Sequence, residues 1–137
     1  GTVRPVLKSS VFGAVRGVAT LGPNVWMTLD DPKALMGLDP SGRLQTSPLT
    51  DTDAISLLAG VDATRMLIAR SDTMQVLIGS PSGPFAVVVS DLEPVSALGW
   101  DSFRERVLMT EAQTNTLVIQ NLATSGLRST SPAPSAD

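Results

Sequence analysis

The sequence predicts an all-β fold built from repeated groups of short strands. Apolar runs are only about five residues long and rich in β-branched residues, and turn-forming Gly, Pro, Asp and Ser separate them. Residues 85–89, Phe-Ala-Val-Val-Val, are typical of these runs. No window of about 11 residues keeps the apolar spacing of an amphipathic helix. The order of the runs also recurs along the chain, which indicates repeated strand groups.

Each repeat begins with a run, a turn and two further runs. The runs of the first repeat are 15–19, 25–29 and 34–38, those of the second are 55–60, 65–69 and 74–79, and those of the third are 95–100, 106–110 and 116–122. Arg65 and Arg106 are 41 residues apart, and so are Trp26 and Leu67. The constant spacing places equivalent residues at the same point of successive repeats.

A Ser-Gly pair follows the third run of each repeat, at 41/42, 82/83 and 125/126. Gly suits a turn between antiparallel strands because it accepts a positive φ. A fourth short run follows each pair, and these runs are 43–47, 84–90 and 127–131. We therefore expect four strands per repeat in one domain over 1–126, with repeats at about 4–42, 43–83 and 84–126. Residues 127–137 are expected to add a last strand and then a Ser/Pro-rich tail.

Composition limits the possible functions. The 137 residues amount to one domain, and 42% hydrophobic with 17% charged residues is typical of a globular protein. Ten Lys and Arg against thirteen Asp and Glu give a net charge of −3, which argues against nucleic acid and membrane as partners. The chain has no Cys and no His, which removes the commonest nucleophile–base pairs and zinc sites. We expect no enzyme activity and no cofactor.

Four strands every 40 to 45 residues or so are typical of a β-propeller blade of the WD-repeat kind. Residues 95–126 resemble such a blade: Val-Ser-Ala-Leu-Gly-Trp at 95–100 is similar to its inner strand, 106–110 to its second and 116–122 to its third. The Trp-Asp pair of the family is replaced by Gln120-Asn121 and Gly79-Ser80, and no Gly-His pair is present. The resemblance covers about residues 15–126. It implies about three four-stranded antiparallel blades and favours an intracellular (cytoplasmic) compartment.

Three blades are too few for a closed propeller, which has about four to eight. Both end faces of such an array are expected to be open, so we expect completion by further blades, by another protein subunit or by a second copy. The expected function is a non-enzymatic protein–protein interaction scaffold. The alternative is a self-contained β-trefoil that binds a carbohydrate or a receptor. The chain has only two Trp, three Phe and no Tyr, whereas lectin-type trefoils bind through exposed aromatic residues, and this shortage counts against the alternative.

Rim loops are the candidate binding sites, because loop residues contact partners more often than strand residues. One rim is expected to carry Arg65 and Arg104, whose side chains suit peptides and carboxylates. The opposite rim is expected to carry the polar residues Asp51, Asp53, Asp72, Gln113 and Asn115. No metal site is expected at Asp51 and Asp53, because the further oxygen ligands and Gly of a calcium loop do not follow. Charge-neutral changes at Asn115 are expected to be silent for folding.

The two Trp residues and three of the Met residues fall on strand positions. We expect these side chains to pack in the core rather than to form a binding surface; they are Trp26, Trp100, Met27, Met66 and Met109.

Overall fold

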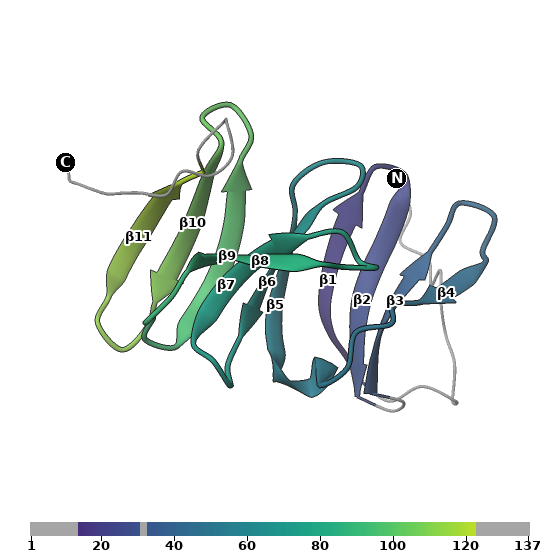
Figure 1. Cartoon of the computed structure of the whole chain (residues 1–137), viewed down its shortest axis with the longest axis horizontal. Coiled ribbons are helices and arrows are strands. Elements are labelled where there is room, and N and C mark those ends of the chain that lie inside the picture. Colours follow the sequence, from purple (N-terminus) through teal and green to yellow (C-terminus); the bar gives the residue numbers. More distant parts are fainter. Residues whose placement is uncertain (1–13, 31–32, 123–137) are drawn as a thin grey trace, which may run out of the picture.

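The computed structural model describes residues 14–30 and 33–122 and shows three antiparallel sheets lying side by side (Figure 1). We call them blades 1, 2 and 3. Blade 1 contains β1 (Val15–Leu21), β2 (Asn24–Asp30), β3 (Lys33–Leu38) and β4 (Leu44–Thr46). Blade 2 contains β5 (Ile55–Gly60), β6 (Met66–Arg70), β7 (Gln75–Gly79) and β8 (Phe85–Val89). Blade 3 contains β9 (Val95–Asp101), β10 (Arg106–Glu111) and β11 (Thr116–Asn121), and a single 3₁₀ turn, η1 (Thr52–Ala54), precedes β5.

The strands of each blade are neighbours in chain order, and the first strands of the blades lie against one another. β1 packs beside β5, and β5 packs beside β9. This is the arrangement of propeller blades around an axis, so the predicted fold class is confirmed. The trefoil alternative is wrong, because within the described residues every strand pair lies within one blade and no barrel joins the three repeats.

The blades are shifted in phase from the sequence repeats. β4 and β8, which stand at the start of the second and third repeats, pair with β3 and β7 of the preceding blade. The hairpin turns between them contain Gly42 at φ +87° and Gly83 at φ +78°, where a side chain would be strained. The strand expected at 127–131 and the Ser/Pro-rich tail lie outside the described residues.

Most of the core lies in two seams between blades, because alternate residues of a strand face opposite sides of its sheet. The seam between blades 1 and 2 is formed by Ala19, Leu21, Trp26, Leu35, Ile55, Leu58, Met66 and Ile68. The seam between blades 2 and 3 is formed by Ala59, Leu67, Ala69, Val76, Leu92, Val107 and Met109, with Trp100 and Val118 packed against it. Trp26, Met27, Met66 and Met109 are all buried, which confirms that they belong to the core.

The two end faces of the array differ. On the face of blade 1 that points away from blade 2, Met27, Leu29 and Leu38 are buried and pack with Met36 and Leu44. Among the large apolar side chains of the described residues, only Val15 and Val18, along β1, are exposed there. Blade 3 instead exposes Leu117 and Ile119 of β11. The expectation of two open faces is therefore correct for blade 3 and wrong for most of blade 1.

Candidate functional site

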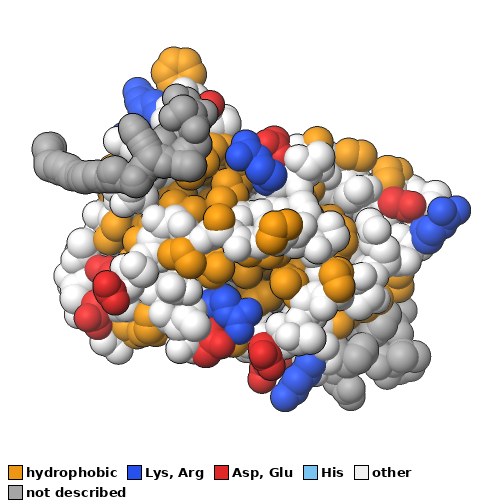
Figure 2. Space-filling view, viewed as in Figure 1, with side chains coloured by type: hydrophobic (Ala, Val, Ile, Leu, Met, Phe, Trp, Pro, Cys, Tyr) orange, Lys and Arg blue, Asp and Glu red, His pale blue; other side chains and the backbone are white. Residues whose placement is uncertain are grey.

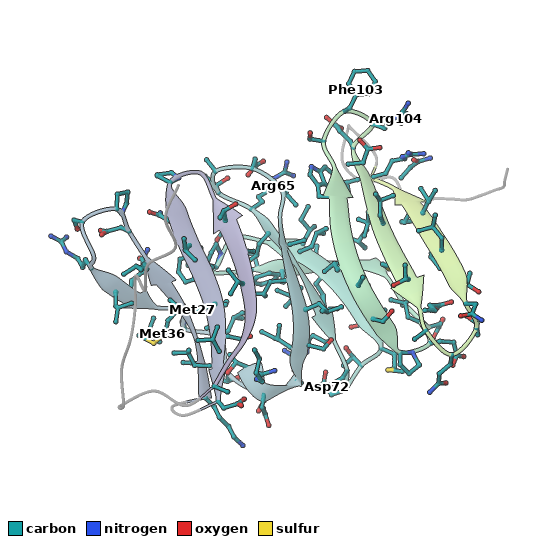
Figure 3. All side chains as sticks on the ribbon, turned by 180° about the vertical axis from the view of Figure 1, so that it is seen from behind. Met27, Met36, Arg65, Asp72, Phe103 and Arg104 are labelled. Atoms are coloured by element: carbon teal, nitrogen blue, oxygen red, sulfur yellow. The ribbon has the colours of Figure 1, made fainter. Side chains whose placement is uncertain are left out.

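The turns before β6 and β10 lie on one rim, which we call the upper rim, and the turns after β6 and β10 lie on the opposite, lower rim. Figure 3 shows Arg65, Phe103 and Arg104 at the upper rim and Asp72 at the lower rim. Each upper turn is held by one aspartate. A carboxylate that accepts hydrogen bonds from the backbone N–H groups of its own turn fixes the conformation of that turn.

Asp62 holds the β5–β6 turn. Its Oδ1 accepts hydrogen bonds from the backbone N–H groups of Thr64 (3.0 Å) and Arg65 (2.8 Å), and its Oδ2 accepts one from Arg65 Nε (2.9 Å). Partial burial raises the pKa of Asp62, but these bonds outweigh it and lower the pKa to about 2. The Arg65 guanidinium is therefore already engaged by a carboxylate of its own turn.

Asp101 holds the β9–β10 turn in the same way. Its Oδ1 accepts from the backbone N–H groups of Phe103 (3.1 Å) and Arg104 (3.2 Å), and its Oδ2 accepts from Arg106 Nη2 (3.0 Å). The hydrogen bond from the Arg104 backbone, followed by the Arg106 side chain, lowers the pKa of Asp101. The carboxylate therefore stays ionised and keeps the turn rigid.

Phe103 is the most exposed large apolar side chain among the described residues, at 86%. The Arg104 guanidinium lies 5.3 Å from its ring centroid, within cation–π range, and only 3.6 Å from Asp101. Aromatic and Arg side chains are enriched at the centres of protein interfaces. Sequence reasoning chose Arg104 and missed Phe103. The sequence signal for Phe103 as a candidate anchor is an aromatic residue inside a polar turn between two strands.

The lower rim brings three of the predicted aspartates around one arginine. Arg70 donates to both oxygens of Asp72, with Nε–Oδ1 at 3.0 Å and Nη2–Oδ2 at 2.8 Å. Asp72 is the main cause of the raised pKa of Arg70, and the charges of Asp51 and Asp53 add to it. Lys33 Nζ lies 3.6 Å from Asp53 Oδ2. The carboxylates are thus partly neutralised, and the pKa of Asp72 is lowered by its bond to Arg70.

Gln113 and Asn115 lie in the exposed β10–β11 turn of the same rim. Asn115 adopts φ +52°, the left-handed region that Asn tolerates better than most residues. This conformation predicts that charge-neutral replacements at Asn115 by residues that avoid the left-handed region destabilise the fold, in contrast to the expectation from the sequence. Whether any of the seven predicted rim residues binds a partner stays a prediction.

A cavity of about 300 Å³ opens on the lower rim between blades 2 and 3. It lies where the β6–β7 turn meets the connection from β8 to β9. Its walls are Ser56, Ala69, Arg70, Ser71, Met74, Gln75, Leu92, Glu93, Pro94 and Val95. Sequence reasoning did not select any of these residues, because the two walls are distant in the chain.

Within residues 14–30 and 33–122, no group of three or more Asp, Glu, Cys or His side chains lies close enough to hold a metal ion. In this same part of the chain, no helix has the length and apolar character needed to cross a membrane.

The fold is similar to that of a chain in the "Crystal structure of Nidogen/Laminin Complex". The TM-score is 0.62 at 13% sequence identity, and the match covers 85% of this chain and 46% of that chain. The chain thus spans about half the length of the chain it matches. No protein-family model matches the sequence, and no curated protein matches it. The similarity at this identity concerns the fold alone.

Proposed function

We propose that the chain is a non-enzymatic protein–protein interaction scaffold, a three-blade part of a WD-like propeller. Further blades, another subunit or a second copy complete the ring. The absence of Cys and His from the whole sequence supports a non-enzymatic role. The similar chain belongs to a structure described as a complex of two proteins, which supports an interaction role.

The observation that carries this proposal is the different exposure of equivalent residues in blades 2 and 3. Val76 and Ile78 of β7 face blade 3, and Val76 is completely buried. Leu117 and Ile119 of β11 stand 41 residues later, at the same points of the blade, and are 62% and 47% exposed. Apolar residues occupy both sets of positions, although only the first set is covered.

The register of the strands supports this equivalence. Leu67 pairs with Ile78 in blade 2, and Leu108 pairs with Ile119 in blade 3. Gly99 lies opposite Leu108 on the inner strand, and a Cβ atom added there would meet no atom within 4 Å. We call this surface the open face; its residues are Ala97, Gly99, Leu108, Leu117 and Ile119. A neighbouring blade would bury it as blade 3 buries its counterpart on blade 2.

Analytical ultracentrifugation of the isolated chain tests the proposal. We expect the chain to self-associate at micromolar concentrations, and the double variant Leu117→Lys/Ile119→Lys to be monomeric with an unchanged circular dichroism spectrum. The control is Val87→Lys, because Val87 is 52% exposed on β8, away from the open face. It should associate like the parent. A parent chain that is monomeric throughout would contradict completion by a second copy through the open face.

A further inference from the structure

We infer that the lower-rim cavity between blades 2 and 3 binds a peptide segment of a protein partner, in which an apolar side chain is flanked by Lys or Arg. The inference deepens the proposed function and rests on it, because it names a class of partner for the same scaffold. Three features carry it: a fixed apolar cavity, a strained methionine in its wall and an excess of carboxylates around its mouth.

The walls of the cavity are held by backbone hydrogen bonds. The N–H of Leu92 donates to the carbonyl of Met74 at 3.1 Å, which ties the β8–β9 connection to the β6–β7 turn. The N–H of Glu93 donates to Glu111 Oε2 at 3.0 Å, which ties the same connection to blade 3. The apolar part of the lining is Ala69, Met74, Leu92, Pro94 and Val95. The volume of about 300 Å³ lies at the lower end of ligand pockets and suits a side chain rather than a cofactor.

Met74 has a backbone conformation that its residue type disfavours. Its φ is +54°, and the residue 41 positions later in the equivalent turn of blade 3 is Asn115, at φ +52°. A left-handed conformation costs about 1–2 kcal/mol for most L-residues, and Asn tolerates it better. The β6–β7 turn therefore carries an unfavourable residue whose side chain lines the cavity. Methionine is flexible and polarisable, which suits a surface that receives an apolar side chain.

The charges around the cavity favour a cationic ligand. Arg70 in the wall is neutralised by its two hydrogen bonds to Asp72. Glu93 also lines the cavity, Glu111 contacts its backbone, and Asp91 stands just before Leu92. The wall and its direct contacts thus carry one guanidinium, that of Arg70, and three carboxylates, those of Asp72, Glu93 and Glu111. Along the lower edge of the molecule, Figure 2 shows acidic side chains, with basic side chains beside some of them. Lys or Arg beside the inserted side chain would complement this charge.

The test uses the full 137-residue chain and a capped synthetic peptide with one Phe between lysine pairs, titrated by isothermal calorimetry. We expect binding that weakens as salt is raised. Replacing the Phe by Ala should weaken it about tenfold or more, the effect of burying one aromatic side chain. Replacing the lysines by glutamates should abolish it. The inference is overturned if the basic peptide does not bind or if the acidic peptide binds equally well.

Substitutions at the two equivalent turns separate the cavity from folding. Met74→Asn should weaken the affinity about fivefold or more, with a melting temperature equal to or above that of the parent. The matched control Asn115→Met should lower the melting temperature and leave the affinity unchanged. Glu93→Lys should weaken binding about two- to fivefold, as expected for one exposed ion pair. Unchanged affinity in both Met74→Asn and Glu93→Lys would overturn the inference.

The two proposals can fail separately. The double variant Leu117→Lys/Ile119→Lys should bind the peptide as the parent does, because the open face and the cavity lie on opposite faces of blade 3. If the parent self-associates but does not bind the peptide, only the cavity inference is overturned. If the parent is monomeric but binds the peptide with the expected effects, only completion by a second copy through the open face is overturned.

Discussion

A large residue and a glycine share one cross-strand pair of blade 1. Trp26 on β2 pairs with Gly37 on β3, and Trp26 is only 6% exposed. A Cβ atom added to Gly37 would lie 2.7 Å from Cε2 and Cζ2 of the indole and 2.9 Å from Cη2. The equivalent pair of blade 2 is Leu67 with Ile78, 41 residues further on. The two blades therefore fill the same space with different residue pairs.

Gly37→Ala should destabilise the protein. Normal carbon–carbon contacts lie at about 3.5–4.0 Å, so the indole must move by close to 1 Å within a packed seam. Overpacking of this kind costs about 1–3 kcal/mol. For a chain of this length we expect the melting temperature to fall by about 4–12 °C, at roughly 4 °C per kcal/mol. Thermal unfolding followed by circular dichroism measures this change.

Transfer of the pair from blade 2 supplies the decisive comparison. The double variant Trp26→Leu/Gly37→Ile should recover most of the stability lost by Gly37→Ile alone, because the smaller Leu leaves room for the Ile. The control Gly99→Ala should melt with the parent, since its Cβ meets nothing within 4 Å. Additive losses in the double variant, or equal losses for Gly37→Ala and Gly99→Ala, would refute this account of the seam.

Three further predictions concern single side chains. Thr28 is 1% exposed and its Oγ1 has no hydrogen-bond partner among the described residues, so Thr28→Val should raise the unfolding free energy by about 1 kcal/mol in a denaturant titration. Asp62 has its pKa lowered from 3.8 to about 2, so its contribution is present above pH 3.8 and is lost as the pH falls through about 2. Because its side chain is 44% exposed, Asp62→Asn should cost only about 0.5 kcal/mol in melts at neutral pH and nothing below pH 2 or so. Asn115 has φ +52°, so we expect Asn115→Ala to lower the free energy of unfolding by about 1 kcal/mol in a denaturant titration. Asn115→Gly should lower it little or not at all, because Gly accepts a positive φ.

The strands and their grouping could be predicted from the sequence because they depend on local patterns. Short β-branched runs predict the strands, the Ser-Gly pairs at 41/42 and 82/83 predict the β3–β4 and β7–β8 turns, and the spacing of about 41 residues predicts the blades. Their strand positions predicted that Met66 and Met109 belong to the core, where both are at most 1% exposed. These features depend on the alternation within a strand and on the repeat length, both of which can be read from the sequence.

The cavity and the anchor of the upper rim could not be predicted in this way. Met74 and Glu93 belong to different connections, and only the stacking of blades 2 and 3 brings them to one cavity. The exposure of Phe103 depends on the Asp101 hydrogen bonds that shape its turn. Sequence reasoning also expected blade 1 to be as open as blade 3, because alternation along a strand does not say what covers a face.

Thiol labelling of two equivalent positions tests the central claim most directly, because the chain contains no Cys of its own. Val76→Cys and Leu117→Cys place single thiols at points 41 residues apart, one buried under blade 3 and one on the open face. At low protein concentration we expect Leu117→Cys to react as fast as a free thiol and Val76→Cys to react only through unfolding. At high concentration, Leu117→Cys should become protected as the open face is covered. Equal protection of both thiols at low concentration would contradict the open face, and a labelling rate of Leu117→Cys that does not change with concentration would contradict its role in assembly.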